Sequence, residues 1–231
     1  MRLPLSFLGL GLALASVFAA DEKPVLPDKR LEDAVRKAVF EKRDNDKPIV
    51  EADLLNIAIV QGTGQQIQSL AGLEKCESLA SLDIARNDVS DLSPLSNMDR
   101  LQYLNAARNE VEDVAPLAPV TALQYIELSA NRVQNVKPLA GLTNLSALYL
   151  STNYITDISA LTGLRKLSSL YLQRNLIQSI EGLGNLRGLN SLHLSDNAIS
   201  DLSGLKGCTS LYYLFLENNK IEDLGPLVEM V

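Results

Sequence analysis

The sequence predicts an elongated α/β solenoid, in which a short unit repeats along the chain and forms one parallel sheet behind a short helical cap. Two observations lead to this fold class. Leucine makes up about a fifth of the 231 residues, whereas aromatic residues account for only 5% and Trp is absent. Leucines also recur every 22 residues from Leu79 to Leu211 without any insertion. A repeated unit of this size buries its apolar side chains by stacking on its neighbours, so the core is expected to run along the whole repeat region.

Residues 1–19 have the pattern of a cleaved export signal. Arg2 gives a positive start, residues 3–18 carry no charge, and the charged stretch 21–23 follows directly. Because spanning a bilayer takes about 20 apolar residues, this run predicts a signal rather than a membrane anchor, which is the alternative. We expect cleavage after Ala19 or the residue that follows it, and no membrane span afterwards. The predicted location is extracytoplasmic: periplasmic, secreted or on the cell surface.

Residues 20–56 are predicted to form a linker and a helical cap. Asp28 follows a proline and can cap a helix, because its carboxylate can accept hydrogen bonds from the first turn. Apolar residues then recur at helical spacing, at Leu31, Val35, Ala38 and Val39. Such a module is needed to cover the apolar end of the first coil.

Residues 57–78 are predicted to form a degenerate first repeat. Four apolar residues lie 22 positions before their counterparts in the next repeat: Ile67, Leu70, Leu73 and Cys76. Gln65 stands in the place of Asn87, and the strand portion at 57–61 is expected to be irregular.

Residues 79–231 contain seven repeats of the pattern L-x-x-L-x-L-x-x-N. The L-x-L part has a period of two, which predicts a short strand with its leucines pointing one way. An asparagine ends each strand, because its amide can both donate to and accept from the backbone of a turn. These asparagines are expected to form a hydrogen-bonded ladder: Asn87, Asn109, Asn131, Asn153, Asn175, Asn197 and Asn219.

This pattern is similar to the leucine-rich repeat. It predicts a right-handed superhelix with a parallel, concave β-sheet. A repeat of 22 residues leaves little room for a full helix, so the convex side is expected to be 3₁₀ or extended.

The second half of several repeats carries a closer resemblance. Residues 89–95, 111–117 and 221–227 follow the segment I-x-D-I-x-P-L with conservative changes. Together with the helical cap, they make residues 27–231 resemble the internalin-like class of bacterial leucine-rich-repeat proteins. The proline is replaced by Ala160, Gly182 and Gly204, and the aspartate by Asn135 and Ser179. The resemblance implies an exported solenoid that binds a protein on its concave face, and it names no partner.

The two cysteines, Cys76 and Cys208, occupy the same column of the repeat and are six coils apart. Stacked strands are spaced by about 4.8 Å, which puts these residues roughly 29 Å from each other. A disulfide requires Cα atoms within about 7 Å. We therefore expect two unpaired cysteines that are buried as small apolar residues.

Side chains that flank the strand leucines are expected to point onto the concave face. These two columns hold five of the seven tyrosines and the single histidine. The candidate binding residues are Tyr103, Tyr125, Glu127, Tyr149, Tyr171, His193, Tyr213 and Phe215. Aromatic side chains dominate binding hot spots, so we predict a surface for a protein or a glycan. The alternative is that these residues serve only as cross-strand neighbours that stabilise the sheet.

Other functions find less support in the sequence. The net charge of −7 argues against a nucleic-acid partner. Two Cys and one His are too few for a zinc cluster. The acidic stretch at 44–46 has Pro48 and Ile49 where a calcium loop needs a ligand and a glycine. We therefore predict neither a metal nor a cofactor.

A catalytic role is also disfavoured. A hydrolytic triad could be sought in Ser191, His193, Ser195 and Asp196. Small polar residues fill the two serine columns in other repeats as well, so no catalytic residue and no enzymatic activity are predicted. A protein-binding module is the leading interpretation. The alternatives are a structural or self-associating envelope protein and an intracellular phosphatase-regulator type of repeat protein, against which the export signal argues.

Overall fold

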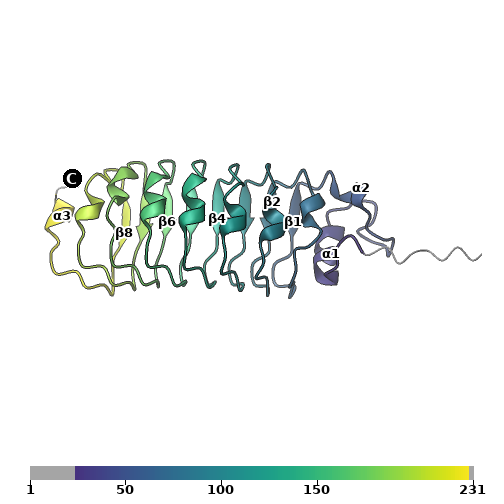
Figure 1. Cartoon of the computed structure of the whole chain (residues 1–231), viewed down its shortest axis with the longest axis horizontal. Helices are drawn as coiled ribbons and strands as arrows, with labels where there is room; N and C mark the ends of the chain where they lie inside the picture. Colours follow the sequence, from purple (N-terminus) through teal and green to yellow (C-terminus); the bar gives the residue numbers. More distant parts are fainter. Residues whose placement is uncertain (1–23, 229–231) are drawn as a thin grey trace, which may run out of the picture.

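The computed structural model describes residues 24–228 as an elongated stack of coils (Figure 1). The predicted signal, residues 1–19, lies outside the described residues. Each coil contributes one strand of three residues, and eight strands form a single parallel sheet in sequence order. The strands are β1 (Ile59–Gln61), β2 (Ser81–Asp83), β3 (Tyr103–Asn105), β4 (Tyr125–Glu127), β5 (Ala147–Tyr149), β6 (Ser169–Tyr171), β7 (Ser191–His193) and β8 (Tyr213–Phe215). The predicted solenoid with a parallel sheet is thus confirmed.

The strand register follows the repeat. Leu82 lies opposite Leu104, and the same column stays paired from one strand to the next along the sheet. Since side chains alternate along a strand, this register keeps every column of the repeat on one face. The β1 strand obeys it too, because Val60 pairs with Leu82. The expectation of an irregular strand at 57–61 was therefore wrong for its last three residues.

Short 3₁₀ turns form the side opposite the sheet, as predicted. They are η1 (Leu73–Lys75), η2 (Ser93–Leu95), η3 (Ala115–Leu117), η4 (Lys137–Gly141), η5 (Ser159–Gly163), η6 (Leu183–Asn185) and η7 (Ser203–Leu205), with a last helical turn α3 (Gly225–Val228). Aspartates in the I-x-D segment start several of them. In the second coil, Asp91 Oδ1 accepts a hydrogen bond of 2.8 Å from the Ser93 amide. This bond satisfies an amide that the turn itself leaves unpaired.

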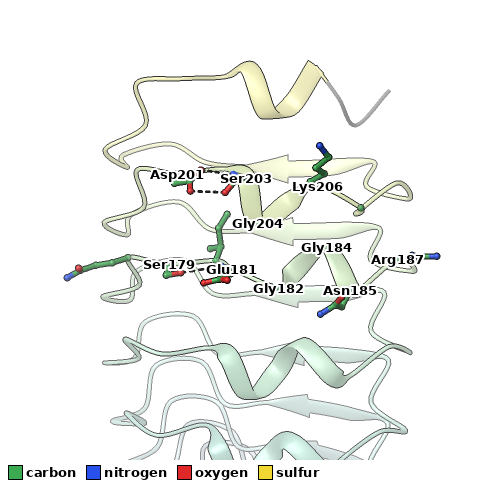
Figure 2. A pocket seen from close by; sticks show the side chains of 13 residues that line it. Ser179, Glu181, Gly182, Gly184, Asn185, Arg187, Asp201, Ser203, Gly204 and Lys206 are labelled. Carbon is green, nitrogen blue, oxygen red and sulfur yellow. Dashed lines mark hydrogen bonds between the residues drawn. The ribbon is translucent and has the colours of Figure 1, made fainter.

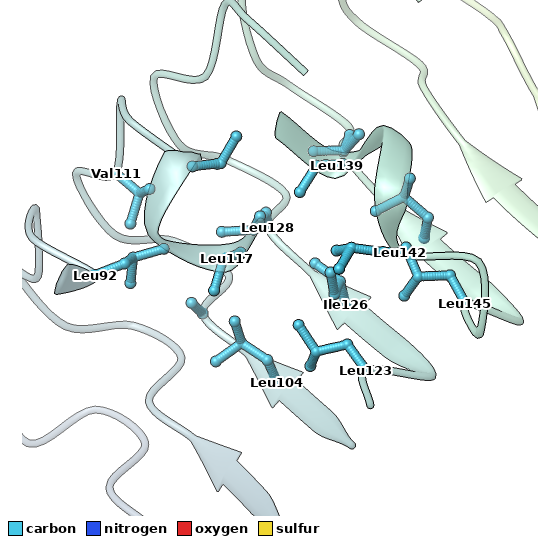
Figure 3. Packing of buried hydrophobic residues seen from close by; sticks show 14 of the residues in the cluster. Leu92, Leu104, Val111, Leu117, Leu123, Ile126, Leu128, Leu139, Leu142 and Leu145 are labelled. Carbon is cyan, nitrogen blue, oxygen red and sulfur yellow. The ribbon is translucent and has the colours of Figure 1, made fainter. Parts of the chain in front are cut away.

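The core lies between the strands and the 3₁₀ turns (Figure 3). Strand residues such as Leu104 and Ile126 meet turn residues such as Leu117 and Leu139, and all four are fully buried. Each coil thus contributes only a thin apolar layer and depends on its neighbours for burial.

The asparagines join adjacent coils through the backbone. Asn131 Nδ2 donates to Leu128 O in its own coil and to Ala106 O in the preceding coil, at 3.0 and 2.9 Å. Its Oδ1 accepts from the Val111 amide of the preceding coil at 2.9 Å. All seven asparagines repeat this pattern. The predicted ladder therefore exists, but its rungs run from side chain to backbone rather than from one asparagine to the next.

Two helices close the N-terminal end: α1 (Lys29–Arg36) and α2 (Glu51–Leu54). Asp28 caps α1 as predicted, because one carboxylate oxygen accepts from the Arg30 and Leu31 amides. Its other oxygen accepts from the Gln68 and Ser69 amides at 2.7 and 3.0 Å, which ties the cap to the first coil.

The helical cap departs from the predicted pattern at two points. The helix α1 ends at Arg36, so Ala38 and Val39 both lie outside it; Ala38 is exposed and Val39 is buried. The Arg36 guanidinium donates to the carbonyls of Lys42, Asn45 and Lys47. These bonds fold the chain into a loop where helical spacing alone predicted more helix. None of the helices in the described part is long and apolar enough to cross a membrane.

The cysteines are unpaired and buried, in agreement with the prediction. Burial raises the pKa of both Cys76 and Cys208 to about 11. Both thiols therefore remain protonated at neutral pH and pack as small apolar groups.

Candidate binding face

Six rings form a continuous line along the sheet, which we call the aromatic ribbon. Each ring contacts the next across a strand, with centroid separations from 4.5 to 5.7 Å. The ribbon consists of Tyr103, Tyr125, Tyr149, Tyr171, His193 and Phe215. Three of the five pairs are stacked or edge to face, arrangements that stabilise aromatic pairs beyond the area that they bury, and the other two are tilted. The ribbon is therefore a pre-ordered surface rather than a set of independent side chains.

The ribbon crosses the sheet diagonally because of one small residue. Tyr103 and Tyr125 precede the central strand leucine or isoleucine, whereas Tyr149 and the later rings follow it. Ala147 is the strand partner of Tyr125. Its methyl group leaves room for the Tyr125 ring to reach Tyr149 at 5.3 Å.

Tyr213 is a predicted binding residue that the structure leaves outside the ribbon. Its ring packs edge to face on Tyr212, with centroids 4.8 Å apart. Sequence reasoning missed Tyr212, which is 77% exposed. Its column otherwise holds small or amide side chains, such as Ser168 and Asn190, and that contrast was the available signal.

Burial raises the pKa of three tyrosine hydroxyls of the ribbon. It raises the pKa of Tyr125 well above its ordinary value, and the neighbouring Tyr103 adds to the effect. The pKa values of Tyr103 and Tyr149 are raised for the same main reason. The hydroxyls can thus both donate and accept hydrogen bonds toward a partner.

Carboxylates flank the ribbon near both of its ends. Glu127 Oε1 accepts from the Ser129 amide at 2.7 Å, and Glu217 accepts from the Ser195 hydroxyl. Asp83 accepts from Thr63 and Asn105. Within residues 24–228, these three carboxylates have no lysine or arginine at ion-pair distance.

His193 lies between two other rings of the ribbon, Tyr171 and Phe215. Burial lowers its pKa below the ordinary 6.5, against the opposing charges of Glu217 and Asp196. The ring is therefore neutral at pH 7.

The triad considered in the sequence is not assembled in the described structure. Ser191 donates to the Tyr171 hydroxyl at 3.2 Å, and Ser195 donates to Glu217. In the described part of the chain, neither serine is hydrogen-bonded to His193. No group of three or more His, Cys, Asp or Glu residues that could hold a metal ion occurs between residues 24 and 228.

A separate hollow of about 630 Å³ lies on the side of the 3₁₀ turns (Figure 2). It lies where glycines replace larger residues. A Cβ on Gly184 would lie 1.9 Å from Lys206 O, and one on Gly204 would lie 2.2 Å from Ile180 O. Glycine in place of proline at Gly182 and Gly204 is visible in the sequence, but the pattern alone does not predict the hollow. Its lining mixes both signs of charge, with Glu181 and Asp201 toward one end and Arg187 and Lys206 toward the other.

Comparison with known proteins agrees with the coil geometry. Leucine-rich-repeat family models match residues 120–177 and, as two copies, residues 187–229. The solved structure of internalin C2 from Listeria monocytogenes is similar to this chain with a TM-score of 0.84 and 31% sequence identity, over 90% of this chain and 91% of that one. The chain belongs to the internalin-like leucine-rich-repeat proteins.

Two further solved structures are similar to this chain. Internalin F from Listeria monocytogenes has a TM-score of 0.55 at 26% identity, over 89% of this chain and 74% of that one. A plant peptide hormone receptor, RGFR1, in complex with RGF2, has a TM-score of 0.59 at 29% identity, over 64% of this chain and 26% of that one. No curated protein matches the sequence significantly.

Proposed function

We propose that this internalin-like chain is an exported interaction module that binds a protein partner through the sheet face carrying the aromatic ribbon. The observation that carries the proposal is the ribbon itself. Six rings in mutual contact expose a large, rigid area on one face of a scaffold that needs no rearrangement to present it. Pre-ordered aromatic side chains lose little conformational entropy when a partner docks.

The repeats and the related structures support an interaction module. The repeats match leucine-rich-repeat families, and one similar structure is that of a peptide hormone receptor in complex with RGF2. We therefore propose a protein rather than a glycan. Export is proposed from residues 1–19 together with the similarity to internalins C2 and F. If the chain is exported and the signal is cleaved, the protein recovered outside the cytoplasm should begin near residue 20.

Site-directed photo-cross-linking tests the face directly. Tyr149 of the ribbon, or Tyr154 as a control, is replaced by p-benzoylphenylalanine in the host that produces the chain. Tyr154 is an exposed tyrosine that lies after the ladder asparagine, outside the ribbon. The proposal predicts an adduct of defined mass from position 149 that disappears when Phe215→Ala is added. An adduct from position 154 alone, or one from position 149 that is unaffected by Phe215→Ala, would overturn it.

A second candidate function is self-association through the last coil. Tyr212, Leu224 and Val228 are 77%, 61% and 76% exposed, so this coil presents more apolar surface than the coils before it. Light scattering over a hundredfold range of protein concentration tests this candidate. A rise in mass that Leu224→Ser abolishes would support it, and a constant monomer mass would exclude it.

A further inference from the structure

We propose that the partner presents cationic side chains, lysine or arginine, to the aromatic ribbon, at one position beside Glu127 and a second beside Glu217. This inference rests on the proposed function, since it specifies the chemistry of the protein that docks on the sheet face. Three independent observations lead to it.

The first observation is the chemistry of the rings. Four of the six ribbon residues are tyrosines, and their rings contact one another in sequence along the sheet. The faces of electron-rich rings attract cations, most strongly where water is partly excluded. The ribbon residues other than Phe215 are half-buried, so a cation that reaches them is partly shielded from water.

The second observation is the state of the two carboxylates. Glu127 and Tyr125 flank Ile126 on one strand and therefore share the sheet face. Glu127 is also the strand partner of Tyr149. Glu217 follows Phe215 by two residues and bonds to Ser195. Within the described residues, Glu127 accepts from the Ser129 amide, and Glu217 accepts from the Ser195 hydroxyl and its own backbone amide. Neither carboxylate has a lysine or arginine at ion-pair distance there, so each keeps lone pairs available for a charged donor.

The third observation is an acceptor that lacks a donor. The Gln173 side-chain oxygen is enclosed and has no hydrogen-bond partner in the described part of the chain. Gln173 belongs to the same column as Ser195 and Glu217, on the coil that precedes Ser195. An enclosed acceptor without a donor is costly, and a rotation of this amide toward the face would offer it to an incoming ammonium or guanidinium group.

Three of the chain's own arginines lie at the edge of this face. Arg86, Arg108 and Arg174 occupy the left-handed turn position after the strands, with φ between 56° and 59°. Arg174 already faces Asp196, at 3.5 Å. Positive charge therefore borders the ribbon without filling it. The arrangement favours a partner whose basic side chains lie over the strands and whose acidic groups lie toward Arg86 and Arg108.

Tyrosine fluorescence gives a direct test, because the chain has no Trp and five of its seven tyrosines lie on the strands of the sheet. The probes are three synthetic peptides, acetyl-(Gly-Arg)₅-amide and its counterparts with glutamate or serine in place of arginine. We expect the arginine peptide to bind more tightly than the other two. Glu127→Gln and Glu217→Gln should each weaken its binding about threefold, the effect of one exposed cation contact.

The matched control is Glu112→Gln, which removes an exposed carboxylate outside the strands. It should leave the affinity unchanged. Equal binding of the serine or glutamate peptide, no binding of the arginine peptide, or equal effects of Glu112→Gln and Glu127→Gln would overturn the inference. Any of these results, together with ribbon-dependent cross-linking from position 149, would refute the charge preference alone. Loss of that cross-linking would refute the proposed function as well.

Discussion

Tyr103 and Tyr125 lie face to face on adjacent strands, with ring centroids 4.5 Å apart and ring planes inclined by only 13°. They are also direct strand partners in the sheet. The contact therefore depends on the strand register that the 22-residue repeat sets. If one strand slipped by one residue, its ring would move to the other face of the sheet and the two rings would separate.

A double-mutant cycle measures this contact. Tyr103→Ala and Tyr125→Ala should be coupled by about 0.5–1.5 kcal/mol in the free energy of unfolding, the range for aromatic pairs. Tyr103 and Tyr171 do not touch, so their alanine variants should be additive. Urea unfolding followed by circular dichroism gives both values. A coupling no larger than that of the separated pair would show that the rings are ordered by the strands alone.

The asparagine ladder predicts a large loss of stability from a small change. In Asn153→Ala, the Val133 amide loses its hydrogen-bond partner inside the core, and Leu128 O and Leu150 O each lose one of their two asparagine donors. The free energy of unfolding should fall by about 3 kcal/mol, because one buried amide is left unpaired and two buried carbonyls each lose a hydrogen bond. Asn219 makes equivalent bonds in the last coil, where it is only half-buried, so Asn219→Ala should cost about 1 kcal/mol. Equal losses in urea unfolding would contradict the role assigned to burial.

Close approach of two coils makes Gly184 sensitive to a single methyl group. A Cβ there would meet Lys206 O at 1.9 Å, whereas nothing lies within 4 Å of one on Gly163. Gly184→Ala should therefore destabilise the chain by about 2 kcal/mol. Gly163→Ala is the matched control and should be neutral or slightly stabilising. Thermal unfolding of the two variants side by side gives the comparison, and similar midpoints would refute the close approach.

The single histidine predicts how stability and pH are linked. Burial lowers the pKa of His193, so below pH 6.5 the unfolded chain takes up a proton before the folded chain does. His193 should therefore favour the folded state less as pH falls from 6.5 toward its folded pKa, and His193→Phe should remove this contribution.

The same titration can be followed in NMR spectra, where the single imidazole gives one isolated signal. The charge of Glu217 raises the pKa of His193 against the effect of burial, so Glu217→Gln should lower the pKa of His193 further. Glu112→Gln should not move it. A pKa above 6.5 in the unmodified chain would contradict the burial of this ring.

The repeat region could be predicted in detail because each column is sampled seven times and every coil must fit its neighbours. Strands, 3₁₀ turns and unpaired cysteines follow from that constraint. The partners of the asparagines could not be predicted, since a column of amides is compatible with bonds to one another or to the backbone. The end of α1 depends on Arg36 reaching three carbonyls in the following loop, and helical spacing carries no information on such contacts.

The ribbon could be predicted in composition but not in its exact membership. Both columns that supply it were identified from the flanking positions of the strand leucines. Whether Tyr213 joins His193 or turns to Tyr212 is decided by side-chain torsions, which the pattern does not encode. Ala147 is the small strand partner that lets the aromatic ribbon pass from one column to the other. An alanine does not stand out as a binding residue in the sequence.

The most direct test of the central claim is the affinity of the partner that is captured from position 149, measured by calorimetry with alanine variants. Tyr171→Ala should weaken binding at least about tenfold, as expected for a hot-spot residue. Tyr154→Ala, which removes an exposed ring outside the ribbon, should leave affinity unchanged. Full affinity of Tyr171→Ala together with a loss of affinity in Tyr154→Ala would place the binding site elsewhere on the solenoid and contradict binding through the aromatic ribbon.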